Sequence, residues 1–159
     1  MTTKPGFTGI AREILLTPVL TVHANYASGD FVGTSATALE FTNAVRTAGG
    51  SGTIIGATLI DYALQSVAAE LWLFSSTVTP PADSAAWTFT DATNCIGVIP
   101  FSTYYASAVN SVSTGTIPNG NIPFVLPATA TSLYGALVTR GAPTYASGDL
   151  TIRLLICEV

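Results

Sequence analysis

The chain has 159 residues, enough for one domain with a substantial core, and its composition excludes several classes of protein. Charged residues make up 9% of it and the net charge is −4, whereas an ordinary soluble domain is about a quarter charged. The five basic residues are spread along the chain, so it has no basic patch for nucleic acid, and no apolar run reaches the length of a membrane-spanning helix.

Hydroxyl groups replace charges as the polar part of the expected surface. The chain has 24 Thr and 13 Ser, and its mean hydropathy is +0.51. Surfaces that are poor in Lys and Glu but rich in apolar and hydroxyl groups are typical of protein interfaces. The composition therefore predicts an obligate assembly component, and the start of the chain, which lacks the apolar core of a signal peptide, predicts folding in a cytosol.

Residues 1–17 are predicted to form an extended N-terminal arm, followed by a single domain at residues 18–159. Apolar patches lie at residues 7–10 and 14–16, on either side of Arg12 and Glu13. They indicate that at least part of the arm docks on the domain or on a partner; the alternative is a frayed terminus.

From residue 18 the chain shows the alternation of β-strands. Leu20, Val22 and Ala24 are predicted to point inward, and further along Leu39 and Phe41 point inward around an outward Glu40. Strands of this kind, with one buried and one solvated face, are typical of a sheet packed on a core.

Residues 50–75 are predicted to form the central hairpin, two strands joined by a short connection. Residues 54–59 are rich in β-branched side chains, and residues 71–74 are apolar in both alternating sets. Such a strand is covered on both faces, by a second sheet on one side and by a loop or a neighbouring subunit on the other. Helical spacing of apolar residues over residues 62–73 leaves a helix as the alternative.

The remaining chain predicts a long surface crossing after residue 74, with a helical turn capped by Asp83 and a short edge strand that starts at Trp87. A Ser-rich and Gly-rich loop is expected at residues 107–120. Further strands are expected at residues 96–105, 122–126, 133–140 and 150–159. About eight strands joined by long crossings predict an all-β fold, a two-sheet antiparallel β-sandwich of jelly-roll-like architecture.

The pentapeptide YASGD occurs twice, ending at Asp30 and at Asp149. Turn chemistry is the favoured interpretation, with Ser-Gly-Asp supplying the bend and Tyr the packing; the alternative is a pair of carboxylates that hold a cation. Cys95 and Cys157 lack metal-ligand spacing, and buried free thiols are favoured over a disulfide.

Catalysis is not expected. The single histidine, His23, is predicted to point outward from a strand, and no nucleophile, nucleotide or zinc motif is present. The acids are isolated, so the sequence predicts neither a glycosidase pair nor a metal site, and no cofactor.

Four aromatic residues are weighed as contact sites. Trp72 lies in the densest apolar run and is predicted to be core. Trp87, Tyr104 and Tyr105 are the candidates for exposed platforms, either for sugars or as anchors for a neighbouring subunit, which the low charge around them favours.

Four segments together resemble the small structural proteins of tailed bacteriophages, namely capsid decoration or cement proteins with a jelly-roll fold. These segments are YASGDFVG, SGTIIGATLIDYALQSVAAELWLF, PADSAAWTFTDA and SLYGALVTRGAPTYASGDLTIRLLI, and the resemblance covers about residues 18–157. They are turn and strand patterns without a catalytic signature.

The resemblance implies a non-enzymatic virion protein that is made in the bacterial cytoplasm and binds the outer surface of a phage capsid. Its expected partners are the major capsid protein and further copies of itself, as a dimer or trimer, with no direct nucleic acid and no membrane. On this hypothesis the contacts with the shell or between subunits are made by Phe7, Ile10, Arg12, Trp87, Tyr104 and Tyr105.

Other functions stay open at this point. A tail or head-fibre module would carry exposed aromatic platforms for host carbohydrate. A carbohydrate-binding domain and a glycosidase are further alternatives, for which the sequence offers less.

Overall fold

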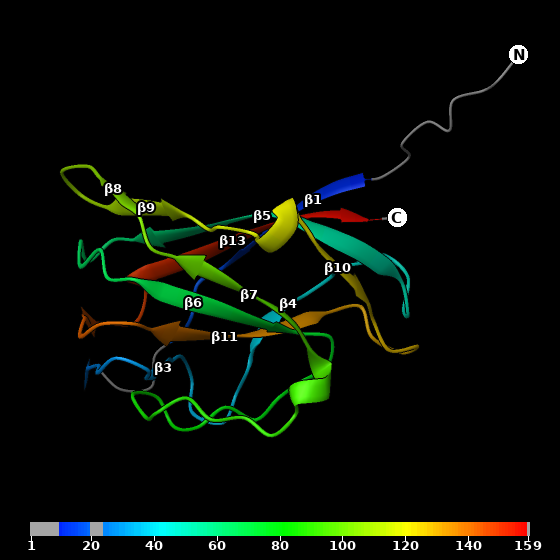
Figure 1. Cartoon of the computed structure of the whole chain (residues 1–159), viewed down its shortest axis with the longest axis horizontal. Helices are drawn as coiled ribbons and strands as arrows, with labels where there is room; N and C mark the ends of the chain where they lie inside the picture. The colour runs from blue at the N-terminus through cyan, green and yellow to red at the C-terminus, as the bar shows by residue number, and fades with distance from the viewer. Residues whose placement is uncertain (1–9, 20–23, 159) are drawn as a thin grey trace, which may run out of the picture.

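The structure is a computed structural model that describes residues 10–19 and 24–158, and these residues form a sandwich of two antiparallel sheets (Figure 1). The six-stranded sheet has the order β1 (Ile10–Leu16), β13 (Leu150–Glu158), β5 (Ser51–Asp61), β9 (Ser111–Thr114) and β8 (Tyr104–Ala106), and β10 (Ile122–Val125) also pairs with β5. The five-stranded sheet has the order β3 (Phe31–Val32), β11 (Leu133–Thr139), β6 (Ala69–Phe74) and β7 (Cys95–Phe101), and β4 (Leu39–Phe41) also pairs with β11. A separate ladder joins β2 (Ala24–Asn25) to β12 (Thr144–Tyr145), and two short 3-10 turns are η1 (Ala92–Asn94) and η2 (Pro118–Gly120).

The core lies between the two sheets because the long strands turn alternate residues inward. In β13, Ile152 and Leu154 are fully buried, whereas Arg153 between them is exposed. Leu71 and Leu73 of β6 belong to the same hydrophobic cluster from the opposite sheet. Burial of this apolar surface is the main term that stabilises the fold. The predicted fold class, an all-β antiparallel sandwich, is confirmed.

Connections between the strands pass repeatedly from one sheet to the other. The chain crosses between β5 and β6, between β7 and β8, and between β10 and β11, which gives the jelly-roll-like alternation that the long crossings predicted. The described residues form thirteen strands, more than the eight or so expected, because seven of them have only two to four residues. One of these, β9, lies inside the segment that was predicted to be a loop.

The prediction that residues 50–75 form a hairpin is wrong, although both strands exist. β5 pairs with β13, β9 and β10, whereas β6 pairs with β11 and β7, so the two strands lie in different sheets. The helix considered over residues 62–73 does not form, because its second half is β6.

The connection between β5 and β6 explains this crossing. The buried carboxylate of Asp61 accepts hydrogen bonds from the N–H groups of Ala63 (2.9 Å) and Ser66 (2.7 Å). Leu64 and Ser66 have positive φ angles, which turn the chain sharply. These bends take the chain from one sheet to the other, whereas a hairpin turn would have returned it alongside β5.

A third layer covers the outer side of the five-stranded sheet. It is the segment between β6 and η1, which runs along the lower side of the molecule in Figure 1. Trp87 and Phe89 stack on each other with ring centroids 5.4 Å apart, and Phe89 contacts Trp72 at 5.3 Å and Phe74 at 5.5 Å. The second face of β6 is therefore covered by a loop, one of the two coverings that the sequence predicted.

Two local predictions in this segment are wrong. No strand starts at Trp87, because the rings of Trp87 and Phe89 pack on the sheet surface, and pairing is limited to one bridge between Asp30 and Ala86. Asp83 caps no helical turn; its buried carboxylate accepts hydrogen bonds from the Tyr26 hydroxyl (2.8 Å) and the Gly33 N–H (3.3 Å).

Part of the predicted N-terminal arm belongs to the sandwich. Residues 10–16 form β1, which pairs with β13 along its whole length. Its alternation explains the pairing, because Arg12, Ile14 and Leu16 turn their half-buried side chains inward while Glu13 and Leu15 are exposed. The domain therefore begins before the predicted boundary at residue 17.

The two YASGD segments adopt one turn geometry and lie side by side. Asp30 accepts a hydrogen bond from the Ala27 N–H and Asp149 accepts one from the Ala146 N–H, both at 2.7 Å. Pairing of β2 with β12 brings the segments together, and the buried rings of Tyr26 and Tyr145 lie 6.1 Å apart. Turn chemistry, the favoured interpretation, is confirmed.

Both cysteine thiols are free. Cys157 is buried near the end of β13, and Cys95 is the half-buried first residue of β7. Within the described part of the chain, no helix is long and apolar enough to cross a membrane.

Candidate interaction surface

The outer side of the six-stranded sheet has no covering layer in the part of the chain that the structure describes, in contrast to the five-stranded sheet (Figure 1). We call the outward side chains of β1, β13, β5, β9 and β8 the sheet face. All of these side chains are exposed or half-buried. They are those of Glu13, Leu15, Ile55, Thr58, Ile60, Tyr105, Val112, Thr114, Thr151, Arg153 and Leu155.

The antiparallel ladders set these side chains in rows across the sheet. Thr58 lies opposite Arg153 on one side and opposite Thr114 on the other. Directly opposed outward residues are close enough to form one continuous surface. A second row runs from β8 to β13 through Tyr105, Val112, Ile60 and Thr151.

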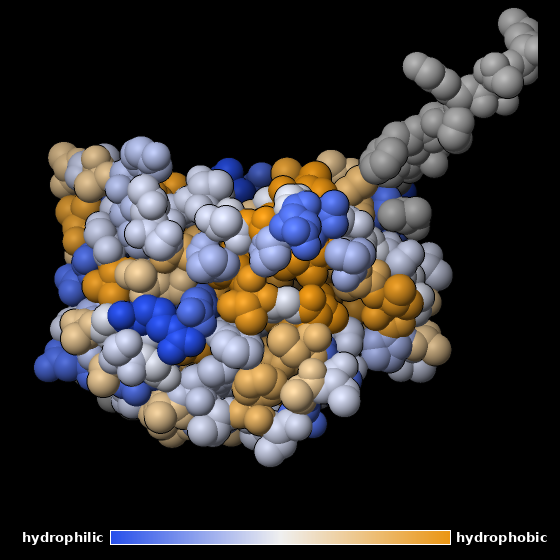
Figure 2. Space-filling model, in the orientation of Figure 1, coloured by the Kyte–Doolittle hydropathy of each residue, from blue (hydrophilic) through white to orange (hydrophobic). Residues whose placement is uncertain are grey.

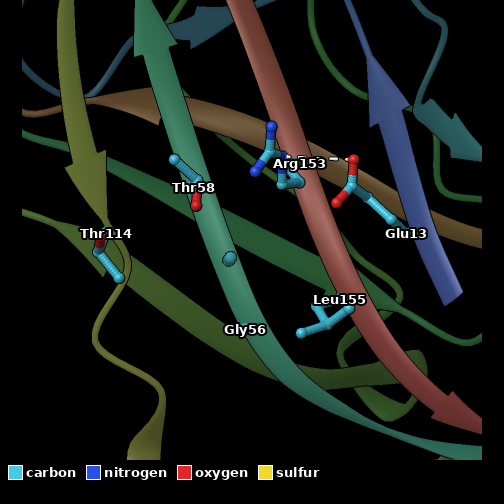
Figure 3. A pocket seen from close by; sticks show the side chains of 7 residues that line it. Glu13, Gly56, Thr58, Thr114, Arg153 and Leu155 are labelled. Atoms are coloured by element: carbon cyan, nitrogen blue, oxygen red, sulfur yellow. Dashed lines mark ion pairs between the residues drawn. The ribbon is translucent and has the colours of Figure 1, made fainter. Parts of the chain in front are cut away.

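The sheet face is almost free of net charge. Its charged members are Glu13 and Arg153, which form an ion pair at 3.6 Å (Figure 3). Because both side chains are about half exposed, the pair contributes at most about 1 kcal/mol to stability. Its main effect is to neutralise the two charges, which leaves a face of apolar and hydroxyl groups.

A shallow hollow lies near the middle of the sheet face (Figure 3). Gly56 contributes no side chain there, and a Cβ atom at this position would lie 3.3 Å from the Cβ of Leu155. Its polar groups are the hydroxyls of Thr58 and Thr114 and the ion pair, and its apolar side includes Leu155. Its lining is Glu13, Gly56, Ala57, Thr58, Thr114, Arg153 and Leu155.

A second apolar surface, the side patch, lies where β10 meets the start of β7. Hydrophobic residues gather there in Figure 2, at the opposite end of the molecule from β8 and β9 (Figure 1). Val125 is 69% exposed, and Ile96 and Pro123 stand beside it in the same recess. We define the side patch as Ile96, Pro123, Phe124 and Val125 together with residues 51–53.

The structure separates the two adjacent tyrosines that were predicted as contact residues. Tyr105 is 74% exposed on the sheet face. Tyr104 is half-buried and its hydroxyl donates a hydrogen bond to the carbonyl oxygen of Val67 at 2.8 Å; burial raises the pKa of this phenol. Tyr104 therefore anchors the connection between β5 and β6, and Tyr105 points outward.

The structure describes only some of the predicted contact residues near the N-terminus. Phe7 lies outside the described residues, as does the side chain of Ile10, whose backbone begins β1. The guanidinium of Arg12 donates a hydrogen bond to the carbonyl oxygen of Asn43 at 2.7 Å and forms an ion pair with Glu158 at 3.3 Å. Arg12 thus ties β1 to β13 and to the chain after β4.

Trp87 is half-buried in the third layer, stacked at 5.9 Å on Phe31 as well as on Phe89. Its ring is therefore engaged within the chain. Trp72, predicted to be core, is half-buried in the same aromatic cluster, and its indole N–H donates a hydrogen bond to Glu70 at 3.1 Å.

The central residues of the sheet face were not among the predicted contact residues. Thr58, Ile60 and Leu155 carry no chemical signature in the sequence. The signal that could have identified them is alternation without charge: in β5 the outward set contains no charged residue, although one face of an antiparallel strand is usually solvated and polar.

Comparisons with protein-family models, with curated proteins and with solved structures found no match to this chain. No group of three or more His, Cys, Asp or Glu side chains that could hold a metal ion occurs among the described residues. These comparisons therefore add nothing to the arrangement of the site and to the resemblance seen in the sequence.

Proposed function

We propose that the chain is a non-enzymatic virion structural protein that oligomerises and binds the outer surface of a phage capsid, where it cements neighbouring major capsid subunits. The observation that carries the proposal is the uncovered, nearly uncharged sheet face, since a sandwich that functions alone solvates its outer sides with charged groups. The choice of a capsid as partner comes from the resemblance of the turn and strand segments to decoration proteins.

The physical logic of cementing fits such surfaces. Apolar and hydroxyl groups lose little on leaving water, whereas each buried charge costs several kcal/mol unless it is paired. Subunits of a shell are fixed in a lattice, so several weak contacts act at high effective concentration. We assign the capsid contact to the side patch and to the N-terminal residues Phe7 and Ile10.

The test is co-sedimentation of the purified protein with expanded shells that lack decoration. Val125→Glu introduces a charge into the side patch, and Val109→Glu, at a position of equal exposure (69%) between β8 and β9, is the matched control. We expect the unaltered protein and Val109→Glu to pellet with the shells and Val125→Glu to bind about tenfold more weakly or worse, because a charge would be desolvated. If the unaltered protein stays in the supernatant, the cement role is wrong; if Val125→Glu binds as well as its control, the side patch is not the contact.

A further inference from the structure

We infer that the sheet face is the interface between two copies of this chain, which pack sheet against sheet about a two-fold axis. The inference rests on the proposed function, because other protein is expected to cover this face in an assembly. It identifies that protein as a second copy of the chain. The capsid contact then remains with the side patch, at the other end of β5 from β8 and β9 (Figure 1).

Size is the first argument. The strands of the sheet face have 7, 9, 11, 4 and 3 residues. Without residues 51–53 of β5, which belong to the side patch, they present roughly 490 Å² per copy in projection, at about 3.3 Å per residue and about 4.8 Å between strands. Accessible surface follows the side-chain relief and exceeds the projection, so two copies reach the lower end of the roughly 1,200–2,000 Å² that stable interfaces bury.

Charge is the second argument. An isologous interface brings each residue near the equivalent patch of the other copy, so a face with a net charge repels itself. Glu13 and Arg153 lie 3.6 Å apart with opposite signs, beside the central hollow. A two-fold axis through this pair sets each carboxylate beside the guanidinium of the other copy, and the four groups then attract one another.

The shape of the surface is the third argument. The side chain of Leu15 is 58% exposed on this face, and the face also has a hollow beside Gly56. In the dimer, an exposed side chain of one copy fills such a hollow in the other, as close packing requires. Face-to-face packing of two twisted sheets, with interdigitated apolar and β-branched residues, is a regular arrangement in β-proteins.

The experiment is sedimentation velocity of the full chain in the absence of shells, over a range of protein concentrations. Thr114→Glu adds a carboxylate at an exposed position on the sheet face, and Thr88→Glu adds the same group at an exposed position in the third layer. We expect the unaltered protein and Thr88→Glu to be dimers and Thr114→Glu to dissociate, with a dimer Kd about a hundredfold higher or more, because each added carboxylate would lose its water in the apolar interface without gaining a partner. Circular dichroism of both variants should match that of the unaltered protein.

A monomeric unaltered protein, a trimer, or a dimer that Thr114→Glu leaves intact would each overturn the inference. Loss of shell binding by Thr114→Glu with an unchanged oligomeric state would also overturn it, since the sheet face would then serve the capsid. A monomeric protein would also remove oligomerisation from the proposed function, whereas binding to the capsid is decided independently by co-sedimentation of the unaltered protein.

Discussion

At the scale of residues, the carboxylates that looked isolated in the sequence serve to hold turns. Asp61 and Asp83 are buried, and both accept hydrogen bonds that compensate the cost of removing a carboxylate from water. Asp30 accepts a backbone hydrogen bond in its own turn. In the sequence, an acid beside small residues can be either a turn residue or a catalytic residue. The structure distinguishes the two, because it shows which groups donate hydrogen bonds to the carboxylate.

Glu70 gives a prediction at this scale. Its carboxylate accepts a hydrogen bond from Arg140 at 2.6 Å, which holds its pKa below the ordinary value of 4.5; a weaker contribution comes from the Trp72 N–H, while burial acts in the opposite direction. Because the folded state binds the proton more weakly, the stabilisation is complete above about pH 4.5 and is lost as the pH falls through the folded pKa.

We therefore expect Glu70→Gln to lower the free energy of unfolding at pH 7 by less than about 1 kcal/mol, since the pair is partly exposed. The difference from the unaltered protein should shrink below pH 4.5. Urea denaturation at several pH values measures this, with Glu40→Gln, at an exposed position in β4, as a control that stays within about 0.5 kcal/mol. A difference that persists undiminished to the lowest pH would contradict the assignment.

At the scale of elements, the alternation of apolar residues predicted most long strands, because burial against one core imposes period two. Leu39 and Phe41 point inward around Glu40 as expected. The pairing of strands was not predictable in the same way. β5 and β6 are neighbours in the sequence but lie in different sheets, and no sequence pattern predicts the hydrogen bonds of Asp61 that bend the chain between them. Strands as short as β9 contain too few residues to show a period at all.

The sequence predicted the composition of the candidate surface but not its location. The low charge of the chain predicts that much of its exterior contacts other protein, but it does not indicate which residues would make that contact. Tyr105 was chosen as an exposed aromatic and lies on the sheet face, whereas its neighbour Tyr104 is turned inward by the same alternation. Trp87 was chosen for the same reason as Tyr105 and lies in an internal cluster, because the strand it meets, β6, is apolar on both faces.

Trp87 gives the prediction for the third layer. We expect Trp87→Ala to lower the free energy of unfolding by about 2–4 kcal/mol, since the substitution leaves a cavity between the rings of Phe31, Phe74 and Phe89. Tyr62→Ala, which removes an aromatic ring that is 49% exposed and lies outside the sheet face, is the control and should cost about 1 kcal/mol or less. Urea denaturation compares the two, and equal losses would mean that the third layer contributes little to the fold.

At the scale of the whole molecule, the two outer sides of the sandwich differ. The aromatic third layer covers the five-stranded sheet, and the described residues leave the six-stranded sheet open. The few charges are also largely neutralised within the chain, because all four arginines form ion pairs with glutamates: Arg12 and Arg46 with Glu158, Arg140 with Glu70, and Arg153 with Glu13. Under the proposed function, contacts with other molecules would therefore depend on apolar and hydroxyl surface.

This distribution of charge predicts how self-association responds to salt. Complexes held by ion pairs between exposed charges weaken steeply as the Debye length falls from about 14 Å at 0.05 M to about 4 Å at 0.5 M ionic strength. The sheet face carries one ion pair, so we expect the dimer Kd to change by less than about threefold over this range, and to fall in sulfate, which strengthens apolar burial. Sedimentation velocity at increasing NaCl concentration, with sodium sulfate at equal ionic strength as the comparison, measures both effects. A Kd that rises by an order of magnitude or more with NaCl would show that charges hold the copies together, and the role assigned to the uncharged face would then be wrong.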